Sequence, residues 1–328
     1  MSYSWWVIFN TSIAAYVTMA VGAGVRRIGW LSEDADHSLM RLVIRVLYPC
    51  LIFSVVSQNE ALHKADNLLL PPLLGFGSMA LGCAAALALA RLGMGINGLT
   101  NDRQRRTFAA CVGIYNYGFI PIPLVQKLFD NSTLGVLFVH NVGAEIAVWT
   151  LGVMLLSGRL GRRWWTGMIN APTIAIVAAL AVNFLGAARF LPDSVVTALK
   201  WFGESSIPMS MVLIGAVIAD QVTPNGRQRN VADRAKVVGW SLLLRLGLLP
   251  LGMLLLAMVL PCSVELKRVV AIQAAMPAAT FPIVLARHYD GDTGVGTWIV
   301  LSSSLVSLIT IPLWIPAGLH LLGVATLP

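Results

Sequence analysis

The sequence predicts an all-α integral membrane protein of ten transmembrane helices, arranged as two inverted repeats of five helices. Three observations lead to this prediction. The 328-residue chain is 57% hydrophobic and only 12% charged, with a mean hydropathy of +0.77, which is too apolar for a soluble globular domain. Apolar runs near the roughly 20 residues that cross a bilayer follow one another between short polar loops. Two of these runs, the fourth and the ninth, are broken by prolines.

Each apolar run is expected to form one membrane-spanning helix, and the loops between the runs are too short to hold a soluble domain. The first run is retained as a helix of the mature protein, because no basic segment precedes Trp5 and Trp6 as it would in a signal peptide. The expected helices cover residues 5–25, 38–57, 68–91, 106–128, 132–157, 169–188, 194–219, 236–260, 267–288 and 294–320.

The net charge of +8 is distributed by loop, which indicates membrane orientation rather than nucleic-acid binding. The odd-numbered loops carry 14 Lys and Arg residues, whereas the even-numbered loops carry six. Because cytoplasmic loops are enriched in Lys and Arg, we expect both termini outside the cytoplasm and the protein in the plasma or inner membrane. The 14 residues are Arg26, Arg27, Arg91, Arg103, Arg105, Arg106, Arg159, Arg162, Arg163, Arg227, Arg229, Arg234, Lys236 and Arg287.

The two halves of the chain are expected to be repeats, residues 1–160 and 161–328. Five helices per repeat force the second repeat to enter the membrane from the opposite side. Pro123 in the fourth helix and Pro282 in the ninth are 159 residues apart. Two further pairs have offsets of 159 and 160, namely the prolines expected to kink helices two and seven and the aspartates after the broken helices: Pro49 with Pro208, and Asp130 with Asp290.

The two broken helices point to a binding site in the membrane. A proline in a helix interior removes a backbone hydrogen bond, and the freed groups are tolerated at membrane depth only where they line a cavity or find protein partners. Inverted repeats with discontinuous helices are typical of secondary transporters with a midplane site, and half-helix N-termini suit an anionic group. The expected crossover prolines are Pro121, Pro123, Pro277 and Pro282.

At these residues the chain resembles the auxin efflux carrier family, which includes plant PIN-type carriers and bacterial relatives linked to organic acids such as malonate or malate. Asn116 followed by Pro123-Leu124 resembles the first crossover motif of the family. Gln273-Ala-Ala-Met-Pro277, with Pro282 five residues on, resembles the second. The wider fold superfamily includes bile-acid symporters. The chain is similar to bacterial members in having no long loop between helices five and six.

This resemblance implies how the helices are grouped. Helices 1, 2, 6 and 7 would form a scaffold domain, and helices 3–5 and 8–10 a transport domain that moves like an elevator around the crossing of helices 4 and 9. The resemblance also implies that Asn116 contacts a substrate carboxylate. Ala278-Ala279-Thr280-Phe281, before Pro282, departs from the plant pattern, so specificity for indole acids does not follow.

Polar and aromatic residues near the breaks are candidate ligands of the substrate. Tyr115 and Tyr117 flank Asn116 and could stack on a ligand or pack among the helices. The second stretch offers mainly Gln273, Thr280 and backbone groups.

Ionisable residues inside an apolar helix are costly and therefore suggest a function. Glu145 lies one helical turn after Asn141, so the two side chains share a face. They could form a proton or cation coupling site, or Glu145 could be a structural, internally paired carboxylate. Arg45 and Arg245 could pair with an anionic substrate or with Glu145, or they could lie at helix ends.

The function expected from these features is secondary active transport, as an efflux carrier or permease, of small organic anions such as carboxylates by alternating access. The expected partners are a small organic acid as substrate, a coupling proton or sodium ion, and membrane lipid. A homodimer is the expected oligomer, and no nucleic acid is expected as a partner. The alternative is a receptor or regulator that keeps the transporter fold. The sequence has no phosphate-binding glycine loop, nucleophile elbow or metal motif, so we expect no enzyme, metal or cofactor.

Overall fold

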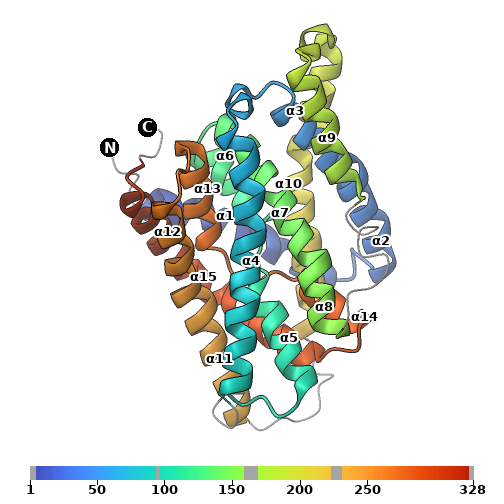
Figure 1. Ribbon diagram of the computed structural model, residues 1–328. Coiled ribbons are helices and arrows are strands. Elements are labelled where there is room, and N and C mark those ends of the chain that lie inside the picture. The colour runs from blue at the N-terminus through green and yellow to red at the C-terminus, as the bar shows by residue number, and fades with distance from the viewer. Residues whose placement is uncertain (1–4, 94–96, 159–168, 223–230, 325–328) are drawn as a thin grey trace.

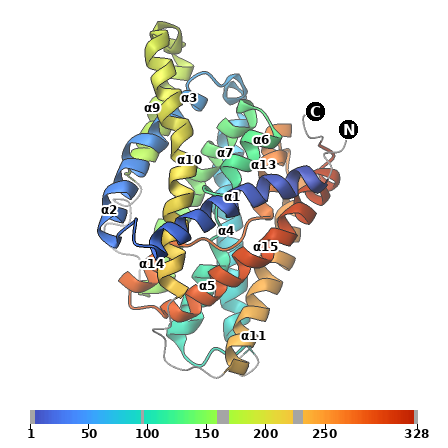
Figure 2. The ribbon, with the colours of Figure 1, turned by 180° about the vertical axis from the view of Figure 1, so that it is seen from behind.

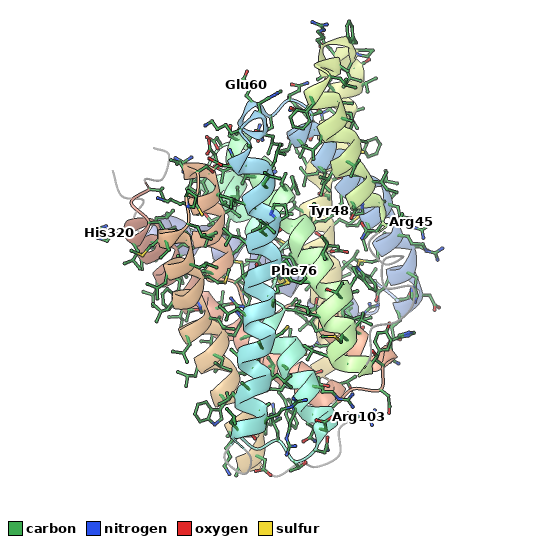
Figure 3. The ribbon with its side chains drawn as sticks, in the orientation of Figure 1. Arg45, Tyr48, Glu60, Phe76, Arg103 and His320 are labelled. Atoms are coloured by element: carbon green, nitrogen blue, oxygen red, sulfur yellow. The ribbon has the colours of Figure 1, made fainter. Side chains whose placement is uncertain are left out.

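The computed structural model describes residues 5–93, 97–158, 169–222 and 231–324. These residues form helices joined by turns and short loops, and the helices stand side by side in an elongated bundle (Figure 1). The loop around Glu60 and the segment that carries Arg103 lie at opposite ends of the bundle (Figure 3). Five arginines of the expected cytoplasmic loops lie outside the described residues: Arg159, Arg162, Arg163, Arg227 and Arg229.

Seven continuous helices in the described residues are long and apolar enough to cross a membrane. Three of them contain a π-helical segment (η1, η3 or η6) between two α-helices. They are α1 (Trp5–Arg27), α2-η1-α3 (Glu33–Leu42, Val43–Leu47, Tyr48–Val56), α4 (Asp66–Leu92), α7-η3-α8 (Asn131–Ala147, Val148–Gly152, Val153–Ser157), α10 (Asp193–Val222), α11-η6-α12 (Val231–Leu242, Leu243–Leu248, Leu249–Val259) and α15 (Thr293–Leu321).

The remaining helices are shorter, and two of the predicted spans consist of two half-helices each. The fourth predicted span contains α5 (Asp102–Gly113) and α6 (Pro121–Leu128). The ninth contains α13 (Val264–Ala274) and α14 (Phe281–His288). The others are α9 (Ala171–Phe184) and the 3-10 turns η2 (Glu60–His63) and η5 (Ala187–Phe190).

The prolines of the broken helices lie where proline is tolerated best. Pro121 begins α6 and Pro282 is the second residue of α14, positions at which a helix has no use for the missing N–H. Pro49 lies in the first turn of α3, directly after η1, and such π-helical irregularities are a known cause of kinks. Pro208 lies inside α10, which continues as α-helix through it, so a kink there stays a prediction.

Helices approach closely where glycine meets the backbone of a neighbour. α4 packs along α7, where a Cβ on Gly75 would lie 2.2 Å from the carbonyl oxygen of His140. α1 crosses the bundle and packs against α10 and α15, as Figure 2 shows. In the contact with α10, a Cβ on Gly215 would lie 1.8 Å from the carbonyl oxygen of Met19. Small residues permit this backbone-to-backbone packing, which is characteristic of membrane helices.

Candidate functional site

The two helix breaks lie side by side and pair through their backbones. The N–H of Asn116 donates to the carbonyl of Pro277 at 2.9 Å, and the N–H of Ala279 donates to the carbonyl of Ile114 at 3.0 Å. Tyr115 and Ala278 thereby form an isolated antiparallel bridge. The N–H of Ala278 also donates to Ser303 Oγ of α15 at 3.2 Å. Extended backbone at membrane depth is therefore satisfied by protein groups, as a lipid environment requires.

Four half-helices meet at this pair of breaks. α5 and α13 end there, whereas α6 and α14 begin just after it. A helix carries partial positive charge at its N-terminus and partial negative charge at its C-terminus. Both kinds of helix end therefore gather at one place, and the N-terminal ends can stabilise an anion.

Asn116 is buried, with 9% of its surface exposed, and its side chain is already half used. Its Oδ1 accepts hydrogen bonds from the N–H groups of Phe119 at 3.0 Å and Ile120 at 3.4 Å, in the turn that leads into α6. Its amide nitrogen makes no hydrogen bond to the described residues. The free half of the side chain is thus a donor, which matches an oxygen of a carboxylate.

Gln273 and Asn141 join the second break to α7. Gln273 is fully buried, and its Nε2 donates to the carbonyl of Tyr117 at 3.1 Å and to Asn141 Oδ1 at 3.2 Å. Its Oε1 is buried, and no group in the described part of the chain donates a hydrogen bond to it. Because buried polar atoms normally have partners, this oxygen is an acceptor that one further donor could satisfy.

Glu145 is connected to the first break through Tyr117, whose hydroxyl donates to Glu145 Oε2. Its other oxygen accepts from Trp149 Nε1 and from Asn170 Nδ2, both at 2.9 Å. Asn170 is the N-cap of α9, so Glu145 links the break to that helix.

No ion pair joins Glu145 to an arginine within the described part of the chain, which contradicts the expected alternative of pairing with Arg45 or Arg245. Arg45 is exposed and points away from the bundle (Figure 3). Arg245 is fully buried and lies over the ring of Tyr115.

The other candidate ligands of the substrate, Tyr115, Tyr117 and Thr280, have different environments. Tyr115 is fully buried, and its hydroxyl lies 2.9 Å from Ser78 Oγ and 3.5 Å from His140 Nε2. Tyr115 thus faces α4 and α7, whereas Tyr117 faces Glu145. Thr280 is partly exposed at the N-cap position of α14, where its side chain makes no capping hydrogen bond.

An open cavity of about 410 Å³ lies beside Pro123, between α1, α6 and α10. It brings together Pro123, expected at the crossover, and Pro208, expected as a kink. Its polar lining includes the side chains Asn10, Thr18 and Lys127, which were not expected from the sequence. The sequence signal that could have indicated this cavity is the presence of polar residues such as Asn10 and Thr18 inside the first apolar helix.

Two ion pairs at the ends of the half-helices were also not expected. Arg268 of α13 lies 3.8 Å from Asp130, which also caps α7 by accepting from the N–H of Thr133 at 2.9 Å. In the second ion pair, Arg103 of α5 contacts Asp290, and Asp292 provides the cap of α15. Each half-helix therefore binds the loop after the other broken helix. Asp130 thus forms an ion pair and caps a helix, whereas in the second half Asp290 forms the ion pair and Asp292 caps the helix.

A membrane-spanning helical bundle with paired, discontinuous helices and an adjoining cavity is the arrangement of a membrane transporter. The sequence matches the family described as "Membrane transport protein" twice, over residues 7–163 and 159–315, and the chain belongs to that family. This confirms the family membership predicted from the two proline-containing stretches.

A similar protein from Methanothermobacter thermautotrophicus is described as "Uncharacterized transporter". It is 26% identical over 311 residues, which cover 93% of this chain and 96% of that protein. The chain is accordingly a multi-pass membrane transporter and not an enzyme.

Proposed function

We propose that this protein is a secondary active transporter of small organic anions such as carboxylates, with the substrate bound where the two helix breaks pair. The observation that carries the proposal is the backbone pairing of residues 114–116 with residues 277–279. It puts the N-termini of α6 and α14 and the free amide of Asn116 in one region. All three features favour a negatively charged ligand.

The proposed architecture has ten membrane crossings, in two inverted repeats of residues 1–160 and 161–328. α5-α6 and α13-α14 are each taken as one crossing, and α9 as another. Both termini then lie outside the cytoplasm, in agreement with the distribution of Lys and Arg over the loops.

The proposed mechanism is alternating access by an elevator-like movement. The cavity beside Pro123 supports it, because α1 and α10 belong to the proposed scaffold and α6 to the proposed transport domain. A movement of one group of helices along the other would change the side from which this cavity is open.

Coupling to a proton or cation is proposed at Asn141 and Glu145. The hydroxyl of Tyr117 and the side chain of Asn170 reach Glu145 from the break and from α9. Binding of a proton or cation to the Glu145 carboxylate would therefore affect the substrate site and the proposed scaffold domain together.

Flux in proteoliposomes tests the proposed function. Purified protein is reconstituted, and uptake of radiolabelled malonate, malate and indole-3-acetate is measured in sodium and in choline buffers, with and without an imposed pH gradient. We expect saturable uptake of at least one carboxylate. Binding of a carboxylate without any flux would instead support the receptor alternative.

Two substitutions at one position test the site. Asn116→Ser keeps a side-chain oxygen for the turn before α6, and Asn116→Asp keeps the acceptor for the N–H groups of Phe119 and Ile120 but adds a negative charge. We expect uptake to fall strongly in Asn116→Asp, while the folded fraction stays that of Asn116→Ser. Equal uptake by Asn116→Asp and wild type would exclude Asn116 from the anion site.

A further inference from the structure

Arg245 is a charged residue that the proposed function has not used. It lies in η6, the π-helical segment between α11 and α12, and none of its surface is exposed. Burying a charge in a membrane protein is costly unless it is paired or serves a function. Other sheltered arginines here have carboxylate partners: Arg26 contacts Asp36 and Asp220, and Arg268 contacts Asp130. Within the described residues, Arg245 has none.

The contacts of Arg245 place its charge directly behind the paired breaks. Its Nη2 donates to the carbonyl of Ala274, the last residue of α13, at 3.3 Å. Its guanidinium carbon lies 4.9 Å from the ring centroid of Tyr115, the residue before Asn116. Its Nε is buried and has no hydrogen-bond partner among the residues that the structure describes. One cation thus contacts both breaks and is not neutralised by any described acidic group.

Helix ends make this position electrostatically significant. α5 and α13 direct their negative C-terminal ends at the breaks, and each such end is equivalent to about half an elementary charge. One guanidinium is therefore about enough to offset both C-terminal ends. The positive N-terminal ends of α6 and α14 then remain uncompensated, and the region beside Asn116 becomes electropositive.

We propose that Arg245 is a positioning residue that sets the preference of the transporter for anions. It offsets the C-terminal ends of α5 and α13, so that a carboxylate at the break meets a net positive potential. This inference rests on the proposed function, because it assumes that an anion binds at the breaks. Arg245 itself does not contact the substrate and acts through the field at Asn116 and the helix N-termini.

The purely structural alternative is that Arg245 only holds the end of α13 through Ala274. The two roles differ in which substitution they tolerate. Arg245→Lys keeps the positive charge but loses the planar guanidinium over Tyr115. Arg245→Gln keeps a neutral amide donor, on a side chain two atoms shorter, but loses the charge. Arg45→Gln is a matched control, because Arg45 lies in a π-helical segment of the other half and is exposed.

The test is the concentration dependence of radiolabelled malonate, malate and indole-3-acetate uptake in proteoliposomes. Arg245→Gln is expected to raise KM about tenfold with little change in kcat, the effect of one unit charge about 10 Å away at an effective dielectric constant of about 20. Arg245→Lys and Arg45→Gln are expected to keep KM within about threefold of wild type, a factor smaller than the loss of one such charge.

Several results would overturn the inference. They are an unchanged KM in Arg245→Gln, equal losses in Arg245→Gln and Arg245→Lys, or a fall in kcat alone. If Arg245→Gln does not fold, a folded Arg245→Lys with a tenfold higher KM would have the same meaning. If the wild-type protein takes up none of the three carboxylates, the proposed function is refuted, and with it this role of Arg245. If the wild type transports but the variants do not show the predicted KM values, only the role of Arg245 is refuted.

Discussion

The two helix breaks have similar backbones but different chemistry. Each follows a half-helix capped by a polar side chain, Asn101 for α5 and Ser263 for α13, and each donates one N–H to the other. The first break carries Asn116 and Tyr117, whereas residues 274–279 of the second contain four alanines. The backbone of the second break thus supplies the partner strand, and the first supplies the side chains that can recognise a ligand.

The helices that follow the breaks differ in the same way. Asn141 lies eleven residues after the cap Asp130, and Ser303 lies eleven residues after the cap Asp292. Both reach the paired breaks, Asn141 through Gln273 and Ser303 through the N–H of Ala278. The two halves therefore place a polar residue at the same position, but in the first half it contacts a candidate ligand of the substrate, and in the second it supports the backbone of the break.

The largest effect is expected from removing the backbone pairing of the two breaks. Ala279→Pro deletes the N–H that donates to Ile114, which leaves a buried carbonyl unsatisfied and costs about 1–3 kcal/mol. We expect loss of nearly all carboxylate uptake and a lower thermal unfolding temperature. Ala279→Gly keeps the N–H and serves as the control. Wild-type uptake by Ala279→Pro would show that the pairing is dispensable.

The next test compares corresponding positions in α7 and α15. Glu145 and Ser307 each lie fifteen residues after the cap of their helix. Glu145→Gln removes the charge that accepts from Tyr117, Trp149 and Asn170, and we expect at least about tenfold slower uptake driven by a pH gradient, a typical loss for a group that transfers protons. Ser307→Ala should stay close to wild type. Equal rates in both variants would remove Glu145 from the coupling site.

Helix packing after the breaks should also be unequally sensitive. A Cβ on Gly135 would lie 2.0 Å from Asn59 Nδ2, which donates to the carbonyl of Asn131 at 2.7 Å. A Cβ on Gly294 would meet only Asp292 Oδ1, at 3.3 Å. We expect Gly135→Ala to destabilise the protein by about 1–3 kcal/mol and Gly294→Ala by about 0.5 kcal/mol or less. Thermal unfolding in detergent measures both, and the reverse order would contradict the described packing.

The smallest difference is expected between the two ion pairs at the half-helix ends. The Arg268 side chain is 12% exposed and also lies over the Phe129 ring, at 5.3 Å from its centroid, whereas Arg103 and Asp290 are 47% and 89% exposed. Arg268→Gln should therefore cost about 1–2 kcal/mol and Arg103→Gln less than about 0.5 kcal/mol. Unfolding curves of the two variants at matched ionic strength test this order.

Much of the fold could be predicted because membrane constraints act on local sequence. Each predicted span overlaps a helix or a pair of half-helices, since hydrophobic length and loop charge follow directly from the bilayer. The offset that connected Asp130 with Asp290 was only partly informative. The structure gives Asp290 the ion pair and Asp292 the cap, because the loop after α14 is longer than the loop after α6.

The site was predictable only in part. The prolines and Asn116 mark the breaks in the sequence, but hydrogen-bond partners such as Asn170 for Glu145 come from other helices, and nothing in the sequence marks them as partners. One of the alternatives considered for Arg45 and Arg245, an ion pair with Glu145, is not found in the described residues for the same reason, since distance along the chain does not say which face of a helix meets which neighbour.

The amino-acid sequence alone identifies this chain as a membrane protein of the transporter class, with two broken helices at matching positions. Composition, span length and proline placement suffice for that, because each is read from neighbouring residues. The folded arrangement adds that the two breaks pair with each other, that Glu145 accepts from neutral groups and that Arg245 lies behind the breaks with no acidic partner in the described residues. Those facts depend on contacts between different helices, some of them more than a hundred positions apart, as in the pairing of Asn116 with Pro277, and the packing of the helices sets them.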